Sequence, residues 1–133
     1  MAVEITEELK KFIHTHINSV EQLEVLLLLR SNSQQEWSAR EVSQKLFIQP
    51  ESAAGRLADL HGSNLLTVRE EGQKLYRYQP QSGALDQHVG SLDRAYKERK
   101  DAVIRLIFSR PVDNIRVFSN AFRIRRDNPG RND

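Results

Sequence analysis

The chain has 133 residues, of which 38% are hydrophobic and 29% are charged, so it can build one compact domain with an extension. It contains no cysteine, which excludes a disulfide framework and thiolate-bound zinc. No apolar run approaches the roughly 18 residues of a membrane-spanning helix, and the acidic N-terminus, with Glu4, Glu7 and Glu8, is unlike a signal peptide. These features favour a cytoplasmic protein with no membrane partner.

The formal net charge of +2 is unevenly distributed along the chain. Residues 1–80 contain 9 Lys and Arg against 11 Asp and Glu, a net of −2, whereas residues 81–133 contain 11 against 7, a net of +4. A nucleic-acid-binding module usually carries a basic patch on its reading element. The charge distribution therefore counts against inferring nucleic-acid binding from a fold alone.

Two helices are predicted before residue 31. Ile5, Leu9 and Phe12 recur at helical spacing, which predicts an amphipathic helix over 5–17. Ser19 can cap a second helix, with Gln22 at the capping-box position. This second helix is apolar on more than one side, which is typical of a buried or sandwiched helix. Its extra apolar face would contact either the first helix or a partner subunit.

The central stretch, 38–79, predicts helix, tight turn, helix and hairpin. Ser38 and Glu41 form a capping box ahead of an apolar helical face, and Pro50 suits the first position of the next helix. The strands are expected at Leu65–Arg69 and Leu75–Gln79, with a glycine-containing turn at 70–73 between them. In the helix–helix turn, the apolar residues Phe47 and Ile48 are expected to fill the angle between the helices.

This order resembles the winged helix-turn-helix of MarR-like bacterial transcription regulators. The resemblance is carried by four segments, which are A-x-E-V-S-x-x-L at 39–46, S-A-A-G-R-L-A-D-L at 52–60, N-L-L-T-V at 64–68 and Y-R-Y at 76–78. It implies a mainly α fold with a small β-hairpin, in which 1–80 form the winged domain with its N-terminal helix. It also implies a short strand near Trp37 that joins the hairpin; from the residues, Trp37 is expected to pack in the core.

The resemblance further implies a homodimer that binds double-stranded DNA, with 50–61 as the recognition helix. The expected DNA-binding residues are Arg40, Lys45, Gln49, Ser52, Arg56, Arg69, Lys74 and Arg77. Arg56, with Ser52 and Gln49 beside it, is the main candidate for reading or positioning, and the other cations would contact phosphates.

Other residues of the same face favour a different function. Ala54 and Gly55 cannot donate a side-chain hydrogen bond, and Glu51 and Asp59 would repel phosphate. The tip of the wing also begins with two glutamates, at 70 and 71. A winged-helix module that binds a protein partner and does not contact DNA therefore stays open as an alternative.

The C-terminal part, 81–126, is predicted to be helical, followed by a disordered tail at 127–133. A heptad-like seam, with one charged break at Arg99, predicts a long helix from 85 to 106, and a shorter helix follows at 113–125. The seam would pack either within one chain or between two. The candidate dimerisation residues are Leu85, Val89, Leu92, Tyr96, Val103, Leu106, Ile115, Phe118 and Phe122.

No catalytic signature is present in the sequence. It has no phosphate-binding or dinucleotide-binding glycine motif and no H-E-x-x-H. Its four histidines are scattered, and His14 and His16 lie two residues apart, so they do not share one helix face. We therefore expect no enzyme activity, no cofactor and no metal site.

Overall fold

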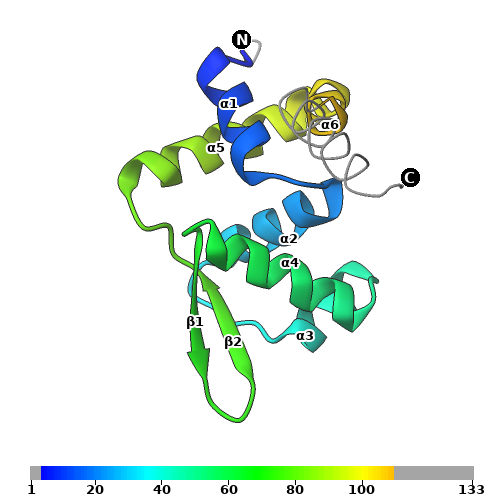
Figure 1. Ribbon diagram of the computed structural model, residues 1–133, viewed down its shortest axis with the longest axis vertical. Helices are drawn as coiled ribbons and strands as arrows, with labels where there is room; N and C mark the ends of the chain where they lie inside the picture. Colours follow the sequence, from blue (N-terminus) through cyan, green and yellow to red (C-terminus); the bar gives the residue numbers. More distant parts are fainter. Residues whose placement is uncertain (1–3, 110–133) are drawn as a thin grey trace, which may run out of the picture.

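The computed structural model describes residues 4–109, and the structural statements below refer to that range. The elements, in chain order, are α1 (Glu7–His16), α2 (Val20–Ser31), α3 (Ala39–Leu46), α4 (Pro50–Gly62), β1 (Leu66–Glu70), β2 (Lys74–Tyr78), α5 (Gly83–Glu98) and α6 (Lys100–Phe108). Figure 1 shows two layers. The layer of α1, α5 and α6 lies above α2, and α3, α4 and the hairpin lie below it. None of the described helices is long and apolar enough to cross a membrane.

The helix starts are set by local capping, as the sequence predicts. The Ser38 hydroxyl accepts from the Glu41 N–H at 3.1 Å, and the Glu41 carboxylate accepts from the Ser38 N–H at 2.9 Å. Ser19 caps α2, but the Gln22 side chain accepts from Asn18, one residue before the capping-box position. α4 begins at Pro50, whose missing N–H removes no helical hydrogen bond at that position.

The wing is a two-stranded antiparallel hairpin with one additional bridge. Leu66 pairs with Tyr78 at one end and Glu70 pairs with Lys74 at the other. Trp37 forms the predicted third strand as a single bridge to Tyr76, with hydrogen bonds of 2.7 and 2.8 Å in the two directions. The Trp37 side chain is buried, as is the side chain of Tyr76, so the hairpin is attached to the core along one face.

α2 is sandwiched between the two layers. Its buried residues Leu23, Leu26 and Leu29 belong to one continuous core that includes residues from α1, α4, α5 and α6. α4 and β2 pack against α2 from one side, and α5 is attached to it by polar contacts on another. α1 packs mainly against α5 and α6. The second apolar face of α2 is therefore covered within the chain.

The predicted long C-terminal helix is wrong in one respect, because it is broken. α5 ends at Glu98 and α6 begins at Lys100, and the φ of −135° and ψ of 55° at Arg99 between them are not helical. In Figure 1, α5 crosses the picture while α6 is seen nearly end-on. The break allows the buried α6 residues Val103 and Ile107 to pack in the layer with α1, which a straight helix would not allow. The predicted 113–125 helix and the tail lie outside the described residues.

Most of the described seam residues pack in the core of the same chain. Val89, Leu92, Tyr96 and Val103 are buried in the core, whereas Leu85 and Leu106 are half-buried against it. Ile115, Phe118 and Phe122 lie outside the described range. Dimerisation through the seam stays a prediction, and among the described members of the set only the two half-buried leucines offer surface to a partner.

Candidate nucleic-acid interface

The exposed face of α4 carries small and acidic side chains. Its exposed residues after Pro50 include Glu51, Ala54, Gly55, Ala58 and Asp59. The opposite face, with Ala53, Leu57 and Leu60, is buried in the core. A Cβ added at Gly55 would meet nothing within 4 Å, so no part of the described chain approaches this face. No side chain in this stripe can donate a hydrogen bond to a base edge or a phosphate.

The two α4 residues expected to read DNA are turned toward α2, so their predicted outward orientation is wrong. The Ser52 hydroxyl and the Arg56 Nε both donate to one oxygen of Glu21, the latter at 2.8 Å. Positions 52 and 56 are four residues apart and therefore lie on one edge of α4, beside the buried face. Hydrogen bonds from Ser52 and then Arg56 lower the pKa of Glu21. The role of both residues in DNA binding stays a prediction.

The arginine of the wing is also paired within the chain. Arg69, on β1, donates to the two oxygens of Glu36 at 2.9 and 2.7 Å and to Glu71 at 2.6 Å. The same hydrogen bonds lower the pKa of Glu36 and raise that of Arg69. Glu36 was not predicted, since 33 residues separate it from Arg69 and no local pattern connects them.

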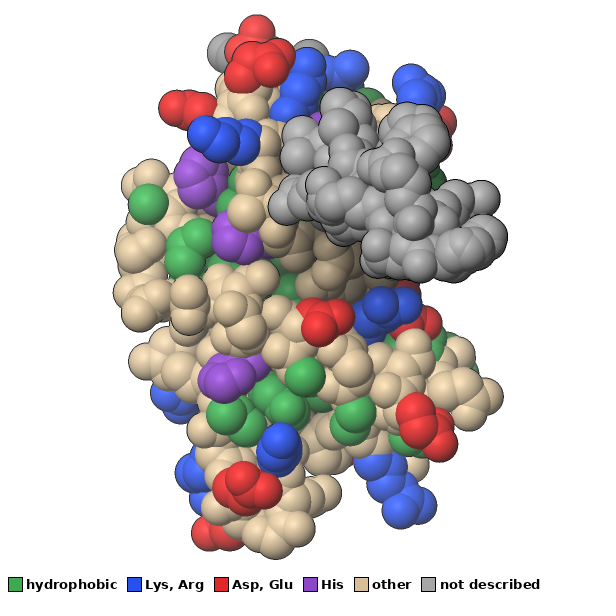
Figure 2. Space-filling model, in the orientation of Figure 1, with side chains coloured by type: hydrophobic (Ala, Val, Ile, Leu, Met, Phe, Trp, Pro, Cys, Tyr) green, Lys and Arg blue, Asp and Glu red, His purple; other side chains and the backbone are tan. Residues whose placement is uncertain are grey.

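The remaining predicted cations lie on α3 and on β2 of the wing. Arg40, Lys45 and Lys74 are exposed and form no ion pair with any described residue. Arg77 is half-buried and donates to Gln79 at 3.0 Å. Basic side chains lie near α3 and beside the wing in Figure 2, with acidic ones at the wing tip. Gln49, also predicted, is the exposed N-cap of α4.

The turn before α4 exposes an aromatic side chain, so the predicted packing of Phe47 is wrong. Phe47 is 94% exposed and has a left-handed backbone with φ of 59°. Such a conformation costs an L-residue about 1–2 kcal/mol, and it turns the Phe47 side chain away from the interhelical angle. Ile48 alone packs against the core, half-buried, as expected.

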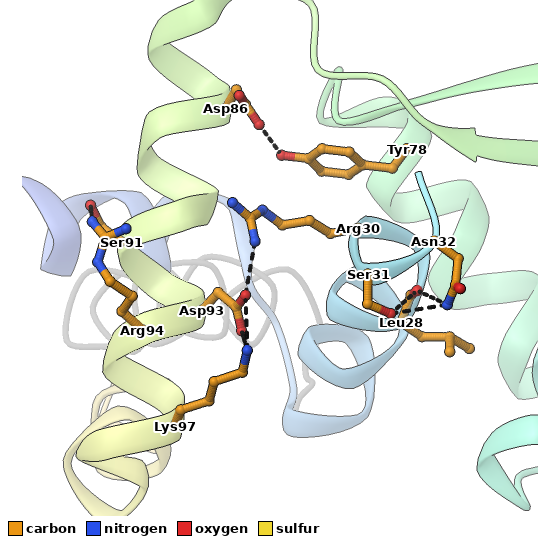
Figure 3. Close-up of polar contacts among 10 residues, drawn as sticks. All are labelled: Leu28, Arg30, Ser31, Asn32, Tyr78, Asp86, Ser91, Asp93, Arg94 and Lys97. Carbon is orange, nitrogen blue, oxygen red and sulfur yellow. Dashed lines mark hydrogen bonds and ion pairs between the residues drawn. The ribbon is translucent and has the colours of Figure 1, made fainter. Parts of the chain in front are cut away.

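A polar network connects the wing, α2 and α5 (Figure 3). Arg30, near the end of α2, donates to Asp93 of α5 at 2.8 Å, and the Tyr78 hydroxyl at the end of β2 donates to Asp86 at 2.6 Å. A Cβ at Gly90 would lie 3.2 Å from an Arg30 nitrogen, so the glycine admits the guanidinium. Burial and the Asp86 hydrogen bond raise the pKa of Tyr78. The network positions the wing relative to α5.

A cavity of about 450 Å³ lies between α1 and the start of α5. The His88 ring stacks on the Phe12 ring with a centroid distance of 5.4 Å, and the His16 ring lies 4.9 Å from the same Phe12 ring. Burial, followed by repulsion from His88, lowers the pKa of His16. Within 4–109, no group of three His, Cys, Asp or Glu side chains is placed to hold a metal ion.

The fold and its surface define a winged helix-turn-helix protein with the MarR-like arrangement of helices. Its structure is similar to that of MepR, a transcription regulator of the Staphylococcus aureus multidrug efflux pump MepA, with a TM-score of 0.53 and 12% identity over 89% of this chain and 85% of that chain. It is also similar to a mutant of S. aureus MepR bound to an oligodeoxyribonucleotide, with a TM-score of 0.50 and 13% identity over 90% and 89% of the two chains.

These likenesses confirm the predicted resemblance at the level of the fold. No protein-family model matches the chain, and no curated protein matches its sequence significantly. At such identities a likeness establishes a shared fold, and function must be argued from the site.

Proposed function

We propose that the protein is a DNA-binding transcriptional regulator that acts as a homodimer and binds the duplex mainly through phosphate contacts. The observation that carries this proposal is the set of exposed cations without an ion-pair partner among the described residues, which are Arg40 and Lys45 on α3 and Lys74 near the tip of the wing. Phosphate contacts fix the position of a protein on the duplex and supply much of its affinity. The shared fold with an oligodeoxyribonucleotide-bound MepR mutant supports the same conclusion.

The homodimer is proposed from geometry rather than from an observed interface. A single winged helix makes few base contacts, and pairing two of them places the recognition helices about one helical turn, ~34–36 Å, apart. The half-buried Leu85 and Leu106 are available for such pairing among the described residues. Measurement of the molecular mass in solution over a series of micromolar protein concentrations tests the homodimer. A monomer at every concentration would contradict it.

The DNA proposal is tested with duplex DNA of random sequence over a series of salt concentrations. The variant Lys45→Ala/Lys74→Ala removes two exposed cations from α3 and the wing, and Lys11→Ala/Arg94→Ala removes two exposed cations from α1 and α5. The slope of log affinity against log salt should become shallower by about 1.8 per winged domain in the first variant, since each phosphate contact contributes about 0.9. The second variant should keep the wild-type slope. Equal losses in both variants, or no binding at low salt, would contradict the proposal.

A second function is favoured by the exposed face of α4. The stripe of Ala54, Gly55 and Ala58 between Glu51 and Asp59 presents no donor, and small residues allow close approach of another backbone. Phe47, three residues before α4, is 94% exposed. It is an aromatic side chain of the kind enriched at protein interfaces. A winged-helix module that binds a protein is therefore the alternative, and it is supported if duplex DNA does not bind at low salt.

A further inference from the structure

Glu21 places a carboxylate against the side chains of α4 that would otherwise be free to bind an anion. One of its oxygens accepts hydrogen bonds from the Ser52 hydroxyl and from the Arg56 guanidinium. Hydroxyl and guanidinium groups are also among the donors that bind phosphate oxygens in nucleic-acid complexes. Glu21 therefore makes, within the chain, the same contacts that a phosphate would make with these two residues.

The contact lies at the edge of the core, within reach of solvent. The side chains of Arg56 and Glu21 are 31% and 29% exposed. Ion pairs in such surroundings contribute only about 0–1 kcal/mol, because water and salt screen them. A phosphate can therefore replace Glu21 as the partner of Arg56 without disrupting the fold.

Packing of α2 on α4 does not depend on this ion pair. Both helices contribute fully buried apolar side chains to the same core, among them Leu23 and Leu26 of α2 and Leu57 of α4. Burial of each such side chain contributes about 1.5–3 kcal/mol. The apolar contact accounts for how α2 and α4 are held together, which leaves the polar contact free to serve another purpose.

We propose that Glu21 is an intramolecular competitor that occupies Ser52 and Arg56 and thereby limits the affinity of α4 for nucleic-acid phosphates. The inference rests on the proposed DNA-binding function and identifies the residue that sets its strength. It also explains why the reading helix presents no unpaired arginine or lysine: Arg56 lies at the edge of the helix but is held by a carboxylate of the same chain. Release of Arg56 would add one phosphate contact for each winged domain.

The test compares duplex-DNA binding over a salt series for the wild-type chain, Glu21→Gln and Glu21→Asp. Glu21→Asp preserves the charge but shortens the side chain by one methylene, so it withdraws the carboxylate from Arg56. The control is Glu24→Gln, which makes the same change of charge on the same helix, where Glu24 accepts from Tyr96 of α5. Thermal unfolding and far-ultraviolet circular dichroism verify that each variant is folded. If Glu21→Gln does not fold, Glu21→Asp is the variant compared with the wild-type chain.

Both Glu21 variants should bind about three- to tenfold more tightly than the wild-type chain at low salt, because a competing charged hydrogen bond has been removed. Their salt dependence should also become steeper by about 0.9 per winged domain. Addition of Arg56→Ala to Glu21→Gln should return both quantities to their wild-type values. Glu24→Gln should not reproduce the steeper slope.

The outcomes separate this inference from the proposed function. If the wild-type chain binds DNA and the Glu21 variants match it in affinity and slope, Glu21 is only a packing residue and the inference is overturned while the function stands. If the Glu21 variants bind and the wild-type chain does not, the competition is supported in its strongest form. If no variant binds at low salt, the function and the inference are both overturned.

Discussion

Each end of α2 forms an ion pair with a different helix, and α2 supplies the acidic member at one end and the basic member at the other. Glu21, in the first turn, pairs with Arg56 of α4, and Arg30, in the last turn, pairs with Asp93 of α5. Both charges are placed favourably for the dipole of α2, acidic at its N-terminal end and basic at its C-terminal end. The two pairs nevertheless have different surroundings, and so we expect different consequences when they are broken.

The two arginines are equally exposed, at 32% for Arg30 and 31% for Arg56, but the carboxylate of the Arg30 pair is the more enclosed. Asp93 is only 16% exposed, against 29% for Glu21. The Arg30 Nε is buried with no hydrogen-bond partner among residues 4–109, and Gly90 leaves just enough room for the guanidinium. An enclosed pair positions elements, whereas a solvent-accessible pair can exchange its partner for a ligand. The polar contact of α2 with α5 is therefore the more enclosed one, whereas its polar contact with α4 is open to solvent although the two helices also pack through buried apolar side chains.

The largest effect is expected from Arg30→Met, which removes the charge but retains an aliphatic side chain. Asp93 would keep only the exposed Lys97, at 3.4 Å, as a partner. Loss of one member of an enclosed pair should lower the free energy of unfolding by about 2–3 kcal/mol, measured by chemical denaturation. Lys97→Met, the control on the same carboxylate, should cost less than about 0.5 kcal/mol. Similar losses in the two variants would show that the enclosure of Arg30 is unimportant.

Gly90→Ala tests whether the glycine is present to admit Arg30. In the wild-type chain the new Cβ would crowd the Arg30 guanidinium, and we expect a loss of about 1 kcal/mol. In the Arg30→Met background the same substitution should stabilise the protein by about 0.5–1 kcal/mol, because alanine favours a helix over glycine. Gly55→Ala, in α4, where the space is open, should stabilise the protein in both backgrounds. Denaturation of the two glycine variants in both backgrounds measures the coupling, and a constant effect of Gly90→Ala would contradict it.

A smaller effect on stability is expected at the other end of α2. Glu21→Gln should lower the free energy of unfolding by less than about 1 kcal/mol, because the pair with Arg56 is partly exposed to solvent. The same variant should change DNA affinity, so stability and binding would separate at this residue. A loss as large as that of Arg30→Met would instead assign Glu21 a structural role.

The smallest effect is a dependence on pH. The folded-state pKa of Glu21 is lowered by its hydrogen bonds from Ser52 and Arg56. The carboxylate therefore adds stability at pH values above its ordinary pKa of 4.5, and this contribution is lost as the pH falls through the lowered, folded-state value. The difference in unfolding free energy between the wild-type chain and Glu21→Gln should be largest near pH 7 and vanish in acid. A difference that grows on acidification would show the opposite sign of linkage.

Much of the fold was predictable because its signals are local. The caps at Ser19 and Ser38 and the start of α4 at Pro50 depend on residues within four positions of each other. The alternation that buries Tyr76 and Tyr78 while leaving Arg77 on the other face follows directly from strand geometry. The MarR-like resemblance drew on these same features, and it was confirmed at the level of the fold for that reason.

The site was less predictable because its contacts are distant in the sequence. The partners Glu21 and Arg56 are separated by 35 residues, and Arg30 and Asp93 by 63. Helical periodicity alone placed Arg56 on the outer face, since it could not include a carboxylate contributed by α2. The same limit applies to Phe47, where apolar character predicted burial but a left-handed backbone at the turn directs the ring into solvent.

The sequence by itself determined where α2, α3 and α4 begin and most of the residues that fill the core, and the order of these elements carried the resemblance to a winged helix-turn-helix. These properties follow from capping, periodicity and hydrophobic burial, which operate over a few residues. Only the tertiary structure decided the break at Arg99 and which arginines are paired with carboxylates of the same chain. Those properties depend on how helices cross, because crossing brings charges from distant positions within hydrogen-bonding distance of one another.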